Sequence, residues 1–329
     1  MKSKSVGLLF FSGSFNAVNL LRMKILIFGG SGFIGKHLIS GMSNGRYEIV
    51  VFTRDPGKVD PDFKQKAKWI KWDGQAMEPV IRNCTGKYAI INLAGENIGG
   101  KLWTKNQKEK ILSSRINITR NISLAINQST EKPVVFIQGS ATGFYGTQDE
   151  KRIDENFAKG TGFLTEVVDA WEKSLKLNDE ELIRIVYIRT GIVLAIDGGI
   201  LPLILQPFRF FLGGCPGNGK QWISWIHIKD VLKAIGFILE NNNISGVFNL
   251  TSPEPVQMKL FCRIAGQSIG KPSWLNIPAF ILKLLPGGMA SELFLTSQKI
   301  FPDRLIEGGF EFGYKDVRTA MYDLLVKKN

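Results

Sequence analysis

The chain has 329 residues, of which 44% are hydrophobic and 22% charged, the composition of an ordinary soluble globular protein. No apolar run approaches the roughly 18 residues that cross a bilayer, so we expect no membrane partner. The formal net charge is +13. Because the Lys and Arg residues are scattered, without a basic helix or an arginine-rich block, we expect no nucleic-acid partner either. A basic protein does suit a polyanionic small ligand.

Two features concern the compartment. The three cysteines are far apart and form neither a metal-binding spacing nor a disulfide framework, which favours a reducing, cytoplasmic location. Residues 1–22 contain no Asp or Glu, and their apolar core is too short for a secretory signal. Met23 opens directly onto an apolar run, so we interpret 1–22 as an extension from an upstream start codon, with an organelle presequence as the alternative.

Short aliphatic runs of strand length recur along the first two thirds of the chain. They are "KILIF" at 24, "EIVVF" at 48, "YAIINLA" at 88, "PVVFI" at 133 and "IRIVYI" at 183, with a weaker "AKWIKW" at 67. They are continuously apolar, as strands buried on both faces of a parallel sheet must be. Stretches of helix length separate them, at 32–43, 104–128 and 162–177. This alternation predicts an α/β fold with a Rossmann-type, doubly wound parallel sheet.

The pattern changes after Arg189. Residues 196–220 are rich in Gly and Pro and predict a long loop that carries a short helix. The α/β pattern returns in 221–250, and helical periodicity interrupted by Pro follows from 251 to the end. We therefore expect a nucleotide-binding domain over 23–195, completed by 221–250. We expect a smaller, mainly helical C-terminal domain over 251–329. Together with 196–220, it would form a substrate or capping region.

Three glycines stand at the junction of the first predicted strand and helix. Gly29, Gly32 and Gly35 form G-x-x-G-x-x-G in "KILIFGGSGFIGKHL". In a dinucleotide-binding turn, the first glycine permits the tight turn, the second lets the backbone approach the pyrophosphate, and the third lets helix and strand pack closely. The phosphates then lie at the positive end of the helix. Because the strand and helix flank this pattern correctly, it predicts a dinucleotide site.

The end of the second predicted strand bears on which dinucleotide binds. It reads "VVFTRD", so Thr53 and Arg54 stand where an NAD site usually has the acid that accepts from the ribose 2′-hydroxyl. A guanidinium matches a 2′-phosphate. The pattern favours NADP(H) as cofactor. Asp55 is adjacent and would serve NAD instead, and Arg54 is also compatible with a plain surface position.

Several motifs follow in a fixed order. They are "GGSGFIG", "NLAGENI" at 92, "SSRINITR" at 113, "GSATGFYG" at 139, "WEKS" at 171, "RTGIVL" at 189, "PFRFFLGG" at 207 and "GNGKQWISWIHIKDV" at 217. Over about residues 23 to 325, the chain resembles the atypical extended short-chain dehydrogenase/reductases called epimerase family proteins, or nucleoside-diphosphate-sugar epimerase-like proteins. The resemblance implies a Rossmann domain that binds NADP(H) and a smaller C-terminal domain that closes the site over a small-molecule substrate.

The resemblance also implies cofactor contacts at matched positions. The pyrophosphate would lie on Gly29, Gly32, Phe33, Ile34 and Gly35, and the adenosine 2′-phosphate on Thr53 and Arg54. Leu93, Ala94 and Gly95 would pass under the ribose and phosphates. Arg115, the arginine of the "SR" motif, would add a second positive contact, although a helix-surface ion pair explains it equally well. Asp73 would touch the adenine or cap a helix.

The acid–base pair of this superfamily is missing. None of the six tyrosines is followed by a lysine four residues later, and the corresponding positions on the helix "GFLTEVVDAWEKSL" fall near Leu164 and Val168. Ser140 stands where the superfamily keeps its catalytic Ser or Thr, and Tyr145 is the candidate for the missing acid. Turn packing is the alternative for Tyr145, and a structural role is the alternative for His227. Lys101 would contact a substrate anion or face water.

Two functions therefore compete. The first is an NADP(H)-dependent oxidoreductase or epimerase that acts on a sugar-nucleotide-like or other carbonyl or hydroxyl substrate, with Ser140 and Tyr145, or a bound water, moving the proton. The second is a catalytically inactive NADP(H)-binding sensor that has lost hydride chemistry together with the Tyr–Lys pair. The sequence fixes neither the substrate nor the oligomeric state.

Overall fold

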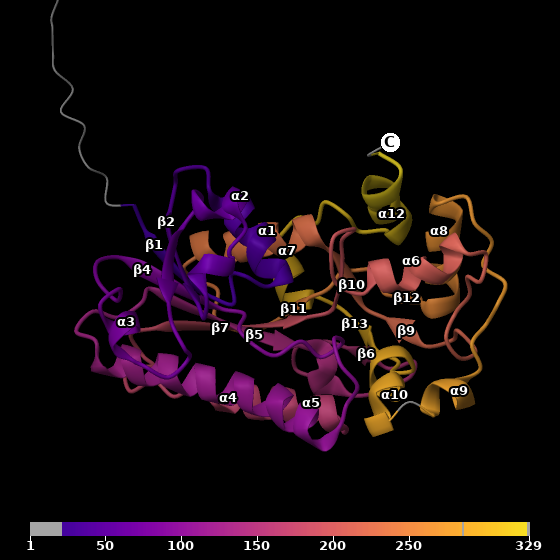
Figure 1. Ribbon diagram of the computed structural model, residues 1–329, viewed down its shortest axis with the longest axis horizontal. Helices are drawn as coiled ribbons and strands as arrows, with labels where there is room; N and C mark the ends of the chain where they lie inside the picture. The colour runs from indigo at the N-terminus through magenta and orange to yellow at the C-terminus, as the bar shows by residue number, and fades with distance from the viewer. Residues whose placement is uncertain (1–21, 285, 328–329) are drawn as a thin grey trace, which may run out of the picture.

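A computed structural model describes residues 22–284 and 286–327 of the protein. Its centre is a parallel sheet of seven strands in the order β11-β7-β5-β4-β1-β2-β3 (Figure 1). The strands are β1 (Lys24–Phe28), β2 (Glu48–Thr53), β3 (Lys68–Lys71), β4 (Tyr88–Asn92), β5 (Val135–Ala141), β7 (Arg184–Thr190) and β11 (Gly246–Leu250). The sequence-based prediction of a doubly wound parallel sheet is confirmed.

Helices cover both faces of this sheet. Figure 1 shows α1 (Phe33–Met42) and α7 (Ile228–Glu240) on one side, and α4 (Lys105–Gln128) and α5 (Phe163–Lys173) on the other. The one-turn helix α3 (Glu78–Ile81) packs against α4. A short helix α2 (Pro61–Lys64) and a 3-10 turn η1 (Pro56–Lys58) connect β2 to β3. Because the seven strands are parallel, their carboxyl ends, and the loops that follow them, meet at one edge of the sheet.

The strand sequences are continuously apolar because each strand supplies two cores. In β1, Ile25 and Ile27 point into the core beneath α1 and α7, and Leu26 and Phe28 point into the core beneath α3 and α4. All four side chains are fully buried. Alternate side chains of a strand face opposite sides, so neither face of this strand tolerates a polar residue.

The C-terminal region has a core of its own, built around Phe208, Phe261 and Met321. Its helices are α6 (Leu201–Arg209), α8 (Met258–Ser268), α9 (Ala279–Lys283), α10 (Met289–Phe294) and α12 (Val317–Leu325), with the 3-10 turn η3 (Pro286–Gly288) between α9 and α10. The helix α11 (Asp303–Glu307) packs instead against β11 of the main sheet, and the 3-10 turn η2 (Thr142–Tyr145) follows β5 and packs against α5. Outside the main sheet, the short strands form three pairs. These are β8 (Ile192–Leu194) with β10 (Trp225–His227), β9 (Trp222–Ile223) with β12 (Val256–Gln257), and β6 (Arg152–Ile153) with β13 (Lys299–Ile300). The region is mainly helical, as predicted.

Within 22–284 and 286–327 no helix combines the length and apolarity needed to cross a membrane. The same residues contain no cluster of His, Cys, Asp or Glu that would hold a metal ion. The extension 1–22 lies, apart from Arg22, outside the described residues.

Candidate functional site

The glycine motif forms the tight turn between β1 and α1. Gly29 has a φ of +84°, and a Cβ there would lie 2.7 Å from the backbone of Leu93 and Ala94. A Cβ on Gly35 would lie 2.4 Å from the carbonyl oxygen of Gly29. Both positions therefore require glycine, one for its left-handed conformation and both for close approach. Sequence reasoning gave Gly35 the role of helix–strand packing, and these contacts agree with it.

Gly32 begins α1 as its N-cap residue. No side chain caps this helix end, and its first turn contains no acidic residue. The first amide groups at such an end lack helical partners, and the helix dipole makes the end positive. The turn therefore suits the pyrophosphate of a dinucleotide, and Phe33, Ile34 and Gly35 are the residues whose amides would meet it. Phe33 also packs against the loop at Gly198 and Gly199.

Thr53 and Arg54 lie at the end of β2, in a pocket beside this turn. Ser31 and Lys36 line the same pocket, from the glycine turn and from α1. Lys58 and the carboxylates of Asp55 and Asp60 line this pocket as well. Three cations, two hydroxyl groups and two carboxylates thus surround one space next to the helix N-terminus. Sequence reasoning found Thr53 and Arg54 from their spacing and missed Ser31 and Lys36, which lie inside the glycine motif or one residue past it. Ser31 lies in the glycine turn and Lys36 in the first turn of α1, beside the helix N-terminus expected to hold the pyrophosphate, and that placement was the available signal.

Asp55, the residue that would favour NAD, is already engaged. Its carboxylate accepts a hydrogen bond from the amide of Gly57 at 3.0 Å, as the N-cap of η1, and pairs with Lys58 at 3.3 Å. The hydrogen bond from the Lys58 ammonium, followed by that from the Gly57 amide, lowers the pKa of Asp55. The carboxylate therefore has a local structural role in the turn after β2.

Leu93, Ala94 and Gly95 follow β4 and pass directly under the glycine turn. The amide of Leu93 donates to the carbonyl of Phe28 at 2.8 Å, which continues the pairing of β4 with β1. Arg115, on α4, lies against Gly95, where an added Cβ would be 3.0 Å from the guanidinium carbon. Arg115 is therefore next to the segment expected to carry the ribose and phosphates, and it also reaches the cavity described next.

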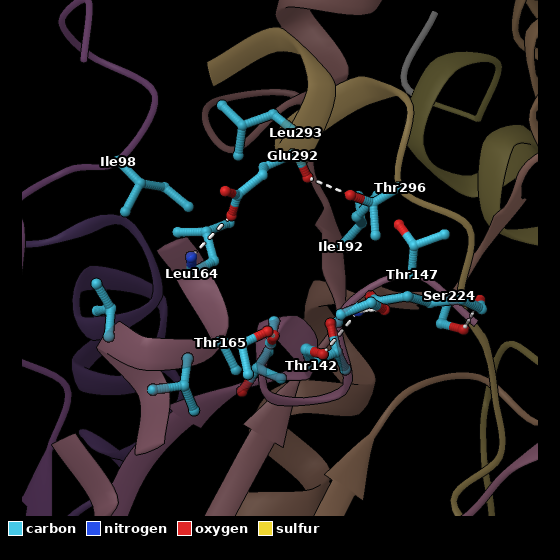
Figure 2. Close-up of a pocket in the computed structure, with 18 of the residues that line it drawn as sticks. Ile98, Thr142, Thr147, Leu164, Thr165, Ile192, Ser224, Glu292, Leu293 and Thr296 are labelled. Atoms are coloured by element: carbon cyan, nitrogen blue, oxygen red, sulfur yellow. Dashed lines mark hydrogen bonds between the residues drawn. The ribbon is translucent and has the colours of Figure 1, made fainter. Parts of the chain in front are cut away.

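A cavity of about 240 Å³ lies where the carboxyl ends of β5 and β7 meet α5 and the C-terminal region. Figure 2 shows Leu164, Thr165, Ile192, Glu292 and Thr296 arranged around its open centre. Many of its polar lining groups are hydroxyls, from Thr142, Thr147, Thr161, Thr165, Thr190, Thr296 and Ser224. A concave site between two structural units, with an apolar wall and several fixed polar groups, is the usual form of a small-molecule site.

The wall supplied by α5 is apolar where the superfamily has its acid–base pair. Leu164 and Val168, the positions assigned to the missing Tyr and Lys, both line the cavity. They are one helical turn apart and hence on one face of α5. Trp171, one turn further along, also lines the cavity. This wall has no proton donor at the two positions where the superfamily places its acid and its lysine.

Arg115 supplies a positive charge at this cavity. Its guanidinium donates one hydrogen bond to the carbonyl of Ile111 at 2.8 Å and stacks over Trp171, with 5.1 Å between the guanidinium carbon and the ring centroid. No Asp or Glu in the described parts of the chain lies within ion-pair distance of it. Burial lowers the pKa of Arg115 to about 10, although the charge of Glu96 acts to raise it, so the group remains charged at neutral pH. A half-buried cation of this kind favours an anionic oxygen on its ligand.

Ser140 and Tyr145, the candidate catalytic residues, lie behind this cavity. The Ser140 hydroxyl donates to the Glu172 carboxylate at 2.5 Å, and the Tyr145 hydroxyl donates to the Asn249 side-chain oxygen at 2.8 Å. Arg189 joins the two, donating to Glu172 and to the Tyr145 oxygen. Both side chains are buried, and the residues that line the cavity here are their neighbours Ala141 to Gly143 and Gly146.

The surroundings of Tyr145 disfavour proton transfer at neutral pH. Burial raises the pKa of this phenol to about 12, against the opposing effect of Arg189. A general acid works best when its pKa lies near the working pH. The geometry therefore supports a positioning role for Ser140 and Tyr145 beneath the turn η2, whereas their assignment as proton donors remains a prediction.

The C-terminal region closes the cavity with two side chains. The Glu292 carboxylate, on α10, accepts hydrogen bonds from the amides of Phe163 and Leu164 at 2.8 and 2.7 Å, and so caps the N-terminus of α5. Gln298 donates to the carbonyls of Thr142 and Gly146 at 2.8 and 2.9 Å. Sequence reasoning missed both, since no local pattern links a residue to a helix end more than 120 residues away.

The remaining candidates lie away from the cavity. His227 is fully buried and caps α7, its Nδ1 accepting from the amide of Lys229 at 3.1 Å. Asp73 accepts from the amides of Gln75 and Ala76 in the turn after β3, which matches the capping alternative. Lys101 is exposed and does not line the cavity.

Comparison with known proteins places these features in a family. Residues 25–163 match the model of the NAD dependent epimerase/dehydratase family. The chain is 36% identical to the epimerase family protein YfhF of Bacillus subtilis (strain 168), over 93% of this chain and 99% of that protein. It belongs to the epimerase family. The chloroplastic epimerase family protein SDR39U1 homolog of Arabidopsis thaliana is 38% identical over 91% of this chain and 86% of that protein.

A solved epimerase family structure has the same fold and carries a cofactor. Human epimerase family protein SDR39U1 (isoform 2), crystallised with NADPH, superposes with a TM-score of 0.83 at 26% identity, covering 93% of this chain and 100% of that one. The UDP-glucose 4-epimerase of Thermus thermophilus, with NAD, shares the fold at 15% identity and a TM-score of 0.72, over 93% of this chain and 100% of that one. Residues 277–324 match a domain of unknown function, DUF1731. A nicotinamide dinucleotide is thus the cofactor class of the family.

Proposed function

We propose that this epimerase family protein binds NADP(H) and exchanges hydride with a small carbonyl or hydroxyl compound, of sugar-nucleotide-like class, in the cavity between α5 and the C-terminal region. The observation that carries the cofactor choice is the pocket shared by Ser31, Lys36, Thr53 and Arg54. Lys58 is a third cation of this pocket, and its two carboxylates, Asp55 and Asp60, accept hydrogen bonds from the amides of Gly57 and Asp62. The cations and hydroxyls beside the α1 N-terminus match a 2′-phosphate and have little to gain from a neutral ribose.

The local hydrogen bond and ion pair of the Asp55 carboxylate also support NADP(H) over NAD. An NAD site uses a free acid at this strand end to accept from the ribose 2′-hydroxyl. Here the carboxylate of Asp55 is held by Gly57 and Lys58. The NADPH in the human relative's structure is consistent with this preference.

The cavity residues define what the chain contributes to the reaction. When bound, the nicotinamide supplies or accepts the hydride. Arg115 would hold the substrate oxygen on which negative charge develops, because its guanidinium lines the cavity without an acidic partner in the described residues. Threonine hydroxyls would orient the remaining polar groups of the substrate, and Leu164 and Val168 would exclude water from one side.

The proton then needs a source other than a Tyr–Lys pair. A water molecule held by the hydroxyls of the cavity wall is the donor we favour, with Ser140 and Tyr145 positioning that wall through Glu172 and Asn249. The alternative, in which Ser140 and Tyr145 themselves move the proton, predicts that removal of both hydroxyls abolishes turnover.

The cofactor assignment is tested by fluorescence titration of the purified protein with NADPH and NADH. We expect tighter binding of NADPH, and Arg54→Ala should weaken NADPH binding about tenfold or more while leaving NADH unchanged, as expected for loss of a charged hydrogen bond. Arg120→Ala, at an exposed arginine on α4, is the matched control. Equal affinities for the two cofactors in the wild-type protein would contradict the assignment.

A second function is favoured by the apolar positions Leu164 and Val168, which leave the superfamily's proton donor without a replacement on α5. In that case the protein is an NADP(H)-binding sensor without hydride chemistry. Incubation of the NADPH complex with a panel of aldehydes, ketones and sugar nucleotides separates the two. Oxidation of NADPH that depends on Arg115 supports the enzyme, whereas tight binding without any oxidation supports the sensor.

We also infer a reducing compartment, such as the cytoplasm. Cys84, Cys215 and Cys262 are free thiols and all three are buried. Burial raises the pKa of each thiol, so these cysteines are packing residues and not reactive ones.

A further inference from the structure

Large apolar side chains are exposed together on one side of the C-terminal region. Phe210, Trp274, Phe280 and Leu284 are 69%, 63%, 68% and 78% exposed. We call this set the apolar face; it comprises Leu203, Phe210, Phe211, Leu212, Trp274, Leu275, Ile277, Phe280, Ile281 and Leu284. Leu203 is on α6 and the others lie on the loop after it, on the segment that leads to α9, and on or just after α9.

Hydrogen bonds hold the two segments of the apolar face side by side. The indole of Trp274 donates to the carbonyl of Phe211 at 2.9 Å, and the amide of Leu275 donates to Gly213 at 3.0 Å. Further along, the amide of Ile277 donates to Cys215 at 3.0 Å. The segment 211–215 and the segment 274–277 are therefore neighbours at the surface. In Figure 1 the chain between α8 and α9 follows the outer edge of the C-terminal region.

This grouping of exposed apolar side chains differs from their distribution elsewhere in the described residues. Elsewhere in the described residues, exposed large apolar side chains such as Leu102, Leu124 and Leu182 are far apart in the sequence and come from different elements. Single exposed leucines need no explanation, but adjacent exposed aromatic and aliphatic residues mark an interaction site. The aromatic share matters, since Phe and Trp bury large areas on contact.

The charge of the same segments is entirely positive. Residues 198–229 and 255–291 contain no Asp or Glu, while they contain Arg209, Lys220, Lys229, Lys259, Arg263, Lys271 and Lys283. The Lys271 ammonium lies 3.7 Å from the ring centroid of Phe211, inside the apolar face, and Arg209 is exposed next to Phe210. Segments that present aromatic side chains and cations and contain no acid are complementary to an apolar layer beneath negative headgroups.

We propose that the apolar face docks the protein onto the surface of an anionic phospholipid bilayer. The aromatic and leucine side chains enter the boundary between headgroups and acyl chains, and Arg209 and Lys271 contact lipid phosphates. The expectation of no membrane partner rested on the lack of a spanning segment, and a docking face requires none. The proposal is independent of the cofactor and of the reaction.

A second copy of this chain is the main rival occupant, and charge disfavours it. In a two-fold symmetric dimer the same patch meets itself. The acid-free segments would then bring Arg209 and Lys271 toward the same cations of the partner, and like charges brought together at an interface cost several kcal/mol. A bilayer with anionic lipids supplies the opposite charge.

Co-sedimentation of the full chain with vesicles tests the proposal. We expect binding to vesicles of phosphatidylcholine with phosphatidylglycerol, little binding to phosphatidylcholine alone, and weaker binding in high salt. The double variant Phe210→Asp/Phe280→Asp should reduce binding about tenfold or more, because it removes two aromatic anchors and adds two negative charges. Leu182→Asp, at a 74% exposed leucine outside the apolar face, is the matched control and should bind like the wild type.

Each other outcome overturns the proposal. Absence of binding to anionic vesicles by folded wild-type protein rejects it, as does equal loss in the Leu182→Asp control. A wild-type dimer in size-exclusion chromatography that the double variant converts to a monomer, without vesicle binding by either protein, assigns the face to a second copy. NADPH titration of the double variant verifies its fold, and unchanged affinity there separates this test from the test of the cofactor assignment.

Discussion

The guanidinium of Arg189 forms a two-pronged ion pair with the carboxylate of Glu172, at 2.9 and 2.8 Å, that ties β7 to α5 behind the cavity. Only 5% and 13% of the two side chains are exposed. Ser140 donates to the same carboxylate and Tyr145 receives a hydrogen bond from the same guanidinium. The two residues expected to carry proton transfer are therefore held by one buried ion pair. Both charges are satisfied only while the pair is intact.

Replacement of Glu172 by alanine should destabilise the protein strongly. It leaves the Arg189 charge buried without its partner and the Ser140 hydroxyl without an acceptor. Removal of one member of a buried ion pair costs about 3–5 kcal/mol. Urea denaturation of Glu172→Ala should show a loss of that size in the free energy of unfolding, and Glu307→Ala, at an exposed glutamate, should show almost none. A loss below about 1 kcal/mol in Glu172→Ala would mean that the pair is solvated in solution.

Removal of the hydroxyls of Ser140 and Tyr145 should affect stability more than cofactor binding. Each hydroxyl makes a hydrogen bond away from the cavity, and the loss of one typically costs about 1 kcal/mol. We expect the double variant Ser140→Ala/Tyr145→Phe to unfold at lower urea concentration and to bind NADPH with wild-type affinity. If a substrate is found, loss of turnover in this variant while its fold and NADPH affinity are retained would restore both residues as proton-transfer groups.

Glu292 links the C-terminal region to the end of α5 that faces the cavity. Glu292→Ala should remove acceptors from the amides of Phe163 and Leu164, and the loss of a helix cap costs about 1 kcal/mol. Glu292→Gln keeps one carbonyl oxygen as an acceptor, so it should lose less. Thermal denaturation should rank the wild type as most stable, Glu292→Gln next and Glu292→Ala last. An alanine variant as stable as the wild type would indicate that water replaces the cap.

Some parts of this molecule could be predicted from the sequence because local rules determine them. The interior positions of β1 and β2 are all apolar because both faces of the sheet are covered. The glycines of the turn are required by contacts within a few residues or with the segment that follows β4. The family resemblance extended this to the C-terminal region. The fold class and the family were both confirmed.

The cavity was less predictable, because its contents depend on contacts between distant segments. Glu292 reaches Leu164 across 128 residues, and the Tyr145 hydroxyl bonds to Asn249 across 104. A motif such as "GFYG" shows that a tyrosine stands near a strand end, but not whether its hydroxyl faces the cavity or the core. Lys36 was missed for a related reason, since it lies on α1 whereas Thr53 and Arg54, which line the same pocket, lie at the end of β2.

His227 should make the stability of the protein depend on pH. Its ring is fully buried, stacks on Tyr314 with 3.8 Å between centroids, and has its Nε2 atom 3.3 Å from Asp323. Burial, the largest cause, lowers the pKa of His227 to about 4 from its ordinary value of 6.5, while Asp323 opposes the shift. Since Nδ1 accepts from the Lys229 amide, the ring is held in its neutral form with the proton on Nε2.

The sign of the effect follows from proton binding. Between about pH 6.5 and pH 4 the unfolded chain protonates this histidine and the folded chain does not, so the free energy of unfolding falls as the pH falls through that range. The difference between a pKa of 6.5 and one of about 4 corresponds to at most about 3–4 kcal/mol. Urea denaturation across this range should show a fall in the wild type that is reduced in His227→Asn, where asparagine can still cap α7 without titrating. Leu182→Asn, at a 74% exposed leucine, is the control and should retain the wild-type pH dependence. Parallel curves for the wild type and His227→Asn would show that His227 titrates normally in the folded protein.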